Sequence, residues 1–100
     1  PPRSTLFPYT TLFRSWQVIY DEFAKKQLSK LDRKAQSDIL RYMRERIATN
    51  DDPHRFGKAL HSDLKGLWRY RVHDYRIICK IEDDKLIVMV VDVDHRKDVY

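Results

Sequence analysis

The stretch LWRYRVHDYRIICKIEDDKLIVMVVDV (67–93) decides the fold of this chain. Apolar and basic side chains alternate in its first part, which is the period of a β-strand with one buried and one solvated face. The pattern is interrupted at His73 and Asp74 and again at Asp83 and Asp84, where tight turns can join successive strands. The segment therefore predicts three consecutive strands, at 67–73, 75–82 and 85–93.

The first of these strands has two chemically different faces. Strand geometry sends neighbouring side chains to opposite sides of a sheet. We expect Trp68, Tyr70 and Val72 on one face and Arg69, Arg71 and His73 on the other. The apolar face predicts contacts with the core, which makes stacking of its aromatic rings on nucleic acid bases the weaker interpretation. The basic face predicts a ribbon that can receive an anionic ligand.

The chain before this segment predicts one further strand and two helices. WQVIY (16–20) is rich in β-forming residues, and Asp21 and Asp32 can each cap a helix that follows. Apolar residues recur at helical spacing in both helices, as Phe23, Ala24, Leu28 and Leu31 and then as Ala35, Ile39, Met43 and Ile47. Residues 53–66 have no clear period and predict a loop. The expected fold is α+β with the order β-α-α-β-β-β, a two-helix hairpin packed on one face of a small, mainly antiparallel sheet.

The amino terminus differs from the rest of the chain. Residues 1–15 (PPRSTLFPYTTLFRS) show no period and begin with two of the chain's four prolines, and residues 5–15 resemble the translation of a widely used DNA-sequencing adapter. We interpret 1–15 as a non-native or disordered tail without function and place the domain at 16–100. The alternative is a natural tail whose apolar residues lie on the protein surface.

Composition limits the classes of function. One hundred residues suit a single domain, and the net charge of +5 favours a polyanionic partner. Cys79 is the only cysteine, so the chain can form neither an internal disulfide nor a cysteine-based metal site, and its apolar strand indicates a core residue. No apolar run approaches the length of a membrane span, and no secretion-signal layout is present. We therefore expect a soluble, cytoplasmic protein.

Two segments carry a resemblance to a known family. The run LKGLWRYRVHDYRIICKIEDDKLIVMVVDVDHRKDVY (64–100) resembles the carboxy-terminal half of RelE/ParE-superfamily toxins, and WQVIYDEFAKKQLSKLD (16–32) resembles their opening strand and helix. The most specific parts are LWRYRV, the YRI of the next strand and the terminal HRKDVY. The resemblance implies the RelE-like fold and, within the superfamily, the branch that cuts messenger RNA.

The chemistry of RNA cleavage points to particular residues. Attack of a ribose 2′-hydroxyl on the adjacent phosphate needs a base, an acid and positive charge near the phosphate. Arginine binds phosphate through two parallel hydrogen bonds and stays charged. Arg76 matches the phosphate-stabilising arginine of the family, whereas the alternative is a surface arginine paired with Asp74 or Glu82. No spacing of carboxylates or histidines suits a divalent ion, so we expect neither metal nor cofactor.

The sequence departs from the family where relatives carry lysines. Arg69 and Arg71 occupy these positions, and arginine does not readily give up a proton, so we assign them phosphate binding and electrostatic stabilisation. The alternative is a solvated strand face. We expect further RNA and phosphate contacts from Lys65, His73, Arg96 and Lys97.

Two residues near the carboxy terminus remain for proton transfer. Tyr100 matches the tyrosine that in relatives removes the 2′ proton or orients and stacks on the substrate. His95 matches a position where some subfamilies place an acid or base, and we expect it to protonate the leaving oxygen. A histidine that only binds phosphate or caps the sheet is an equal alternative.

The resemblance implies a toxin of a type II toxin–antitoxin system that cleaves messenger RNA on the ribosome. It also implies a RelB-like antitoxin, with operator DNA bound only through the toxin–antitoxin complex. One alternative is a ParE-like inhibitor of DNA gyrase, although such relatives generally lack the arginines and terminal tyrosine. The other is an inactive nucleic-acid-binding relative.

Overall fold

The structure, a computed structural model, describes residues 15–95. The tail expected at 1–15 lies outside this range except for Ser15, so that interpretation and the domain boundary at residue 16 stay predictions. The helices and strands are, in chain order, β2 (Gln17–Tyr20), α2 (Glu22–Ser29), α3 (Arg33–Tyr42), the π-helical turn η1 (Met43–Ile47), the 3₁₀ turn η2 (Pro53–Phe56), β3 (Lys58–Ala59), the 3₁₀ turn η3 (Ser62–Leu64), β4 (Trp68–Val72), β5 (Tyr75–Glu82) and β6 (Ile87–His95).

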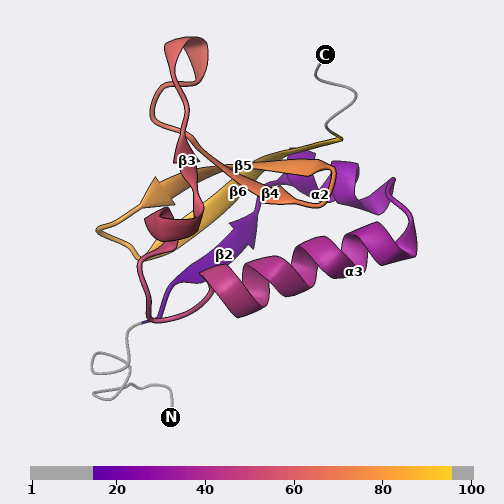
Figure 1. Ribbon diagram of the computed structural model, residues 1–100, viewed down its shortest axis with the longest axis horizontal. Helices are drawn as coiled ribbons and strands as arrows, with labels where there is room; N and C mark the ends of the chain where they lie inside the picture. Colours follow the sequence, from indigo (N-terminus) through magenta and orange to yellow (C-terminus); the bar gives the residue numbers. More distant parts are fainter. Residues whose placement is uncertain (1–14, 96–100) are drawn as a thin grey trace.

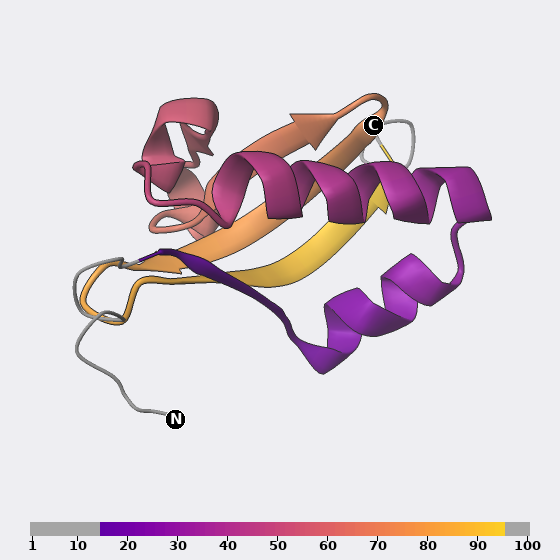
Figure 2. The ribbon, with the colours of Figure 1, turned by 90° about the horizontal axis from the view of Figure 1, so that it is seen from below.

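The strands form one five-stranded sheet in the order β2-β6-β5-β4-β3 (Figure 1). β2 runs parallel to β6, and the other three pairings are antiparallel. The helices α2 and α3 lie on the same side of this sheet, as the view from below shows (Figure 2). The expected α+β class, element order and one-sided helix pair are therefore confirmed. The structure adds β3, because two residues of the expected loop pair with the start of β4.

Both helices begin at the predicted caps. The side chain of Asp21 accepts a hydrogen bond from the Ala24 amide at 2.8 Å, and that of Asp32 accepts one from the Ala35 amide at 2.7 Å. Such bonds satisfy amides that have no partner within the helix. The expected buried face of α2 is wrong at one position, because Phe23 is 59% exposed. Ala24, also part of the expected face, is buried, and Phe23 points away from it because adjacent helical residues point about 100° apart.

The second helix buries its predicted stripe along the whole length. Ala35, Ile39, Met43 and Ile47 are all buried against the sheet. A spacing of four residues slightly overshoots an α-helical turn of about 3.6 residues, so such a stripe drifts around the helix. The wider π turn η1, with its bond from the Ala48 amide to the Met43 carbonyl, counteracts this drift. The local change of helix type thus keeps the last two stripe residues in the core.

Tyr70 on β4 joins the sheet to the segment that follows α3. It is fully buried, and its hydroxyl donates a hydrogen bond to the Pro53 carbonyl at 2.8 Å. Burial raises the pKa of this phenol, so the hydroxyl keeps the proton that it donates. A Cβ at Gly57 would lie only 3.2 Å from rings of both Trp68 and Tyr70, so glycine permits this close approach. Two 3₁₀ turns and β3 therefore replace the irregular loop expected at 53–66.

The final strand begins later than the alternation predicts. The chain turns at Leu86, which has a φ of 55°, and β6 begins at Ile87 instead of at residue 85. A register shift between Ile78 and Cys79 leaves one extra residue on β6. The shift keeps Val88, Val90 and Val93 in the core although their spacing is not strictly two.

We predict that Tyr70→Phe destabilises the protein by about 1–3 kcal/mol, because it leaves the Pro53 carbonyl without its buried donor. Urea unfolding of both proteins measures the difference. Tyr75→Phe is the matched control, since Tyr75 is only partly buried. Equal midpoints for Tyr70→Phe and the unsubstituted chain would show that this hydrogen bond does not anchor η2.

Candidate functional site

Two arginines stand opposite each other on neighbouring strands. Arg71 on β4 and Arg76 on β5 are direct partners in the antiparallel register. Direct partners share a face of the sheet, with Cβ atoms about 4.5–5.5 Å apart. Tyr70 and Val72, the neighbours of Arg71, are buried in the core under the helices, so the arginine pair lies on the face without helices. The side chains of Arg71 and Arg76 therefore start from neighbouring backbone positions on the same face of the sheet.

Further basic residues lie on the same face, because side chains along a strand alternate between its two faces. Arg69 pairs with Ile78 across β4 and β5, and Lys80 lies two residues beyond Ile78. The predicted separation of Arg69 and Arg71 from Trp68, Tyr70 and Val72 is confirmed. We call Arg69, Arg71, Arg76 and Lys80 the arginine face.

The environment of Arg76 differs from that of Arg71. Arg71 is exposed, whereas Arg76 is half-buried and its Nε atom is inaccessible to solvent. Within residues 15–95 this Nε has no hydrogen-bond partner. A buried donor without an acceptor is costly, and native proteins usually supply an acceptor from a side chain, water or a ligand. The geometry thus leaves the Arg76 Nε–H without an acceptor among residues 15–95, and an added anion can reach this solvent-inaccessible atom only if the side chain turns.

The acids expected to neutralise Arg76 do not do so. In the described part of the chain, neither Asp74 nor Glu82 forms an ion pair with Arg76. Glu82 instead lies 3.8 Å from the ammonium of Lys85. Asp94 is the cross-strand partner of Arg76 on β6, and Asp92 binds the side-chain amide of Gln27 at 2.6 Å. The alternative interpretation of Arg76 as a surface ion-pair residue therefore has no support from these two partners.

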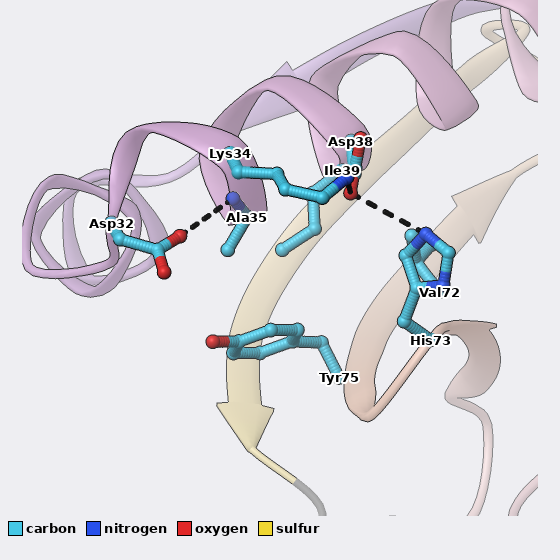
Figure 3. A pocket seen from close by; sticks show the side chains of 8 residues that line it. All are labelled: Asp32, Lys34, Ala35, Asp38, Ile39, Val72, His73 and Tyr75. Carbon is cyan, nitrogen blue, oxygen red and sulfur yellow. Dashed lines mark hydrogen bonds and ion pairs between the residues drawn. The ribbon is translucent and has the colours of Figure 1, made fainter.

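His73 does not extend the arginine face, contrary to the prediction from alternation. It lies in the two-residue turn between β4 and β5 with a φ of 54°, so the strand period ends before it. Its Nε2 lies 3.4 Å from a carboxylate oxygen of Asp38 on α3 (Figure 3). The imidazole is thus directed to the helix side of the sheet.

His95 also lies on the helix side. It is the cross-strand partner of Tyr75, and the two rings meet edge to face with centroids 5.0 Å apart. Tyr75 packs against the core, and its neighbour Arg76 points to the other face. Asp94, the residue before His95, is the cross-strand partner of Arg76, and successive residues of a strand point to opposite faces. The expected convergence of His95 with the arginine pair is therefore not observed.

The other predicted site residues are distant or outside the described range. Lys65 follows η3 in the loop between β3 and β4, at the end of β4 away from the arginine pair. Arg96, Lys97 and Tyr100 lie outside the described residues. Their predicted roles remain predictions.

The structure reveals a cavity that we did not predict from the sequence. It has a volume of about 210 Å³ and lies between α3 and the turn joining β4 to β5 (Figure 3). Its lining combines apolar residues with charged ones, namely Asp32, Lys34, Ala35, Asp38, Ile39, Val72, His73 and Tyr75. The sequence feature that could have pointed to this cavity is Asp38, an acidic residue between Lys34 and Arg41 on a basic helix. This feature is confined to the helix and does not indicate that the turn between β4 and β5 lies beside it.

Two buried groups are unsuited to proton transfer. Cys79 is fully buried and burial raises the pKa of its thiol, in agreement with its interpretation as a core residue. Burial also raises the pKa of Tyr20 to about 12, with a smaller effect of Cys79.

Within residues 15–95, no three side chains of His, Cys, Asp or Glu come together to hold a metal ion. None of the described helices has the length and apolar character to cross a membrane.

Comparison with known proteins gives a consistent result. The model of the family "ParE toxin of type II toxin-antitoxin system, parDE" matches residues 18–100. Toxin RelG of Mycobacterium tuberculosis (strain ATCC 25618 / H37Rv) is 29% identical over 93 residues, which are 93% of this chain and 97% of the relative. Toxin RelE of the same strain is 31% identical over 85 residues, covering 85% of this chain and 86% of the relative.

Solved structures share the fold. The toxin–antitoxin complex RelBE2 from Mycobacterium tuberculosis contains a chain with a TM-score of 0.76 and 27% identity, covering 82% of this chain and 92% of that one. A chain of the intact E. coli RelBE toxin–antitoxin complex has a TM-score of 0.61 at 17% identity, with coverages of 80% and 95%. The second likeness concerns the fold alone.

We predict that Cys79 resists alkylation in the folded protein, because the thiol is buried and reagents attack the thiolate. Mass spectrometry after iodoacetamide treatment should show an unmodified chain without denaturant. In urea the same treatment should add one adduct per chain, since the chain has one cysteine. Rapid modification without denaturant would place Cys79 outside the core.

Proposed function

This chain belongs to the ParE toxin family of type II toxin–antitoxin systems, within the RelE/ParE superfamily, and on that premise we propose that it cleaves messenger RNA. The observation that carries the proposal is the paired placement of Arg71 and Arg76, two guanidinium donors on the face of the sheet without helices. Such donors suit the non-bridging oxygens of a phosphodiester.

The proposed reaction is a transfer within the RNA. The 2′-hydroxyl loses its proton and its oxygen bonds to the adjacent phosphorus, while the bond from phosphorus to the 5′ oxygen breaks. The leaving oxygen takes up a proton, so the products end in a cyclic 2′,3′-phosphate and a 5′-hydroxyl. Negative charge grows on the phosphate oxygens during this step, and fixed cations lower its free energy.

The three arginines of the arginine face each have a part in the proposal. Arg76 binds and stabilises the scissile phosphate, because its guanidinium is partly withdrawn from solvent and electrostatic attraction is stronger there. Arg71 supplies a second guanidinium to the same phosphate, and Arg69 holds the RNA backbone along the strand. Arginines in place of the family's lysines thus keep the charge and leave proton transfer to other groups.

We assign proton transfer to residues at and after the end of β6. We propose that Tyr100 removes the 2′ proton, which requires cations nearby to lower the free energy of its phenolate. His95 protonates the leaving oxygen in this scheme only if the substrate reaches the edge of the sheet, because its ring lies beside Tyr75 on the helix side. Arg96 and Lys97 provide further phosphate contacts.

The proposed partners follow from the relatives. Chains of similar fold occur in RelBE toxin–antitoxin complexes, which supports a RelB-like antitoxin as the natural partner. We propose that the antitoxin covers the arginine face and that only the complex binds operator DNA. The proposed substrate is messenger RNA on the ribosome, which places the protein in the cytoplasm.

One observation favours a second candidate function. The matching family model is that of ParE toxins, and ParE-like relatives poison DNA gyrase. A gyrase inhibitor needs no paired guanidinium groups around one phosphate, so the register of Arg71 with Arg76 favours RNA cleavage. The loss of the family lysines keeps an inactive nucleic-acid-binding protein as a third candidate.

We predict that Arg76→Ala lowers message cleavage by about 10²–10³-fold, the usual loss when one transition-state donor is removed. The assay measures cut message in a translation reaction with purified ribosomes. Arg76→Lys should keep part of the activity, because it keeps the charge and loses the two-pronged geometry. Arg44→Ala is the matched control, since Arg44 is an exposed arginine of η1 on the helix side.

The same proteins separate the candidate functions. Unchanged cleavage by Arg76→Ala would remove the arginine pair from the site. Inhibition of gyrase supercoiling without cleavage would select the second candidate. RNA binding without either activity would select the third.

A further inference from the structure

The turn that joins β4 to β5, next to the two arginines, is short and strained. His73 and Asp74 alone separate β4 from β5, and Val72 with Tyr75 is the one residue pair between this turn and the Arg71–Arg76 pair. The φ of 54° at His73 is uncommon for a residue with a side chain and costs about 1–3 kcal/mol. Any movement of the turn is therefore transmitted directly to the arginine pair.

The sheet holds this end of β4 on one edge only. β3 pairs with β4 at Trp68 and Arg69 and ends there, so within residues 15–95 Arg71 has a neighbouring strand on the β5 side but none on the other. Packing on the helix side of the sheet is also incomplete, because the cavity of about 210 Å³ lies between α3 and the turn. Neither backbone pairing nor close packing fully fixes the turn.

One polar contact crosses the cavity. The carboxylate of Asp38 on α3 lies 3.4 Å from Nε2 of His73, as Figure 3 shows. Asp38 is itself held in place, by Arg41 at 2.7 Å and by Lys34 at 3.2 Å, and its side chain is only 11% exposed. The Lys34 hydrogen bond is the largest of the effects that lower the pKa of Asp38, so the group is anionic at neutral pH. The helix thus presents a fixed anion to the turn.

We propose that Asp38 is a positioning residue that acts through His73: it holds the turn between β4 and β5 and so sets the placement of Arg71 relative to Arg76. The inference rests on the proposed function, in which this pair binds the scissile phosphate. Asp38 touches no substrate, because it lies on the helix side of the sheet. Displacement of a catalytic group by about 1 Å can cost about 10²-fold in rate, so a tether of this kind affects turnover more than stability.

A double-mutant cycle tests the proposal. The four proteins are the unsubstituted chain, Asp38→Asn, His73→Gly and the double variant, each measured for message cleavage and for urea unfolding. His73→Gly also relieves the positive φ, so it should not destabilise the fold. We expect each single variant to lower kcat by about tenfold and the double variant to lower it no further, because the two residues act as one tether.

Two further variants separate positioning from general disturbance. His73→Gln should retain most of the activity, since its side-chain amide nitrogen is about as far from the backbone as Nε2 of histidine and can donate to Asp38. Leu86→Gly is the matched control, because glycine adopts the φ of 55° without strain at the turn on the end of β5 away from His73. Its kcat should stay unchanged.

A readout independent of catalysis accompanies the cycle. The side-chain Nε–Hε NMR signals of Arg71 and Arg76 should shift in Asp38→Asn and His73→Gly alike, and not in Leu86→Gly. Additive losses of kcat, no retained activity in His73→Gln, or unshifted arginine signals would each overturn the tether. If the unsubstituted chain cleaves no RNA, the proposed function fails, and the NMR signals alone still decide whether Asp38 positions the pair.

Discussion

The antiparallel register of β4 with β5 places Arg71 opposite Arg76, and the account of this protein depends on that pairing. The two-residue turn fixes the register, since a shift by one residue would send one arginine to the other face. Two like charges opposite each other destabilise a strand pair, by up to about 1 kcal/mol. Asp94, the cross-strand partner of Arg76 on β6, offsets part of this cost, and a bound phosphate would offset more of it.

The one-sided arrangement of helices makes the pairing usable. α2 and α3 cover the apolar face of the sheet, where Ile39, Met43 and Ile47 meet Tyr70 and Val90. The opposite face carries no helix in the described part of the chain (Figure 2). Hydrophobic burial and ligand binding are therefore assigned to different sides of the same strands, and substitutions on one side need not disturb the other.

Periodicity predicted the parts of the structure that depend on local geometry. Alternation placed Arg69 and Arg71 opposite the aromatic core residues, and the spacing of Ile39, Met43 and Ile47 predicted the buried side of α3. The same reasoning failed at His73, because a residue with positive φ in a turn no longer follows the strand period. His95 was expected at the site from the family resemblance, and its face depends on the register of β6 with β5, which local periodicity does not determine. The contact between Asp38 and His73 joins residues far apart in sequence, so no local pattern indicates it.

The central claim is that Arg76 donates to a phosphodiester, and a titration followed by NMR tests it most directly. A short RNA with a 2′-deoxy sugar at the cleavage position binds but cannot react, because the attacking hydroxyl is absent. The Nε–Hε signal of Arg76 should move progressively with added RNA, and the signal of Arg44 on the helix side should not. Saturating RNA that leaves the Arg76 signal in place would contradict the account.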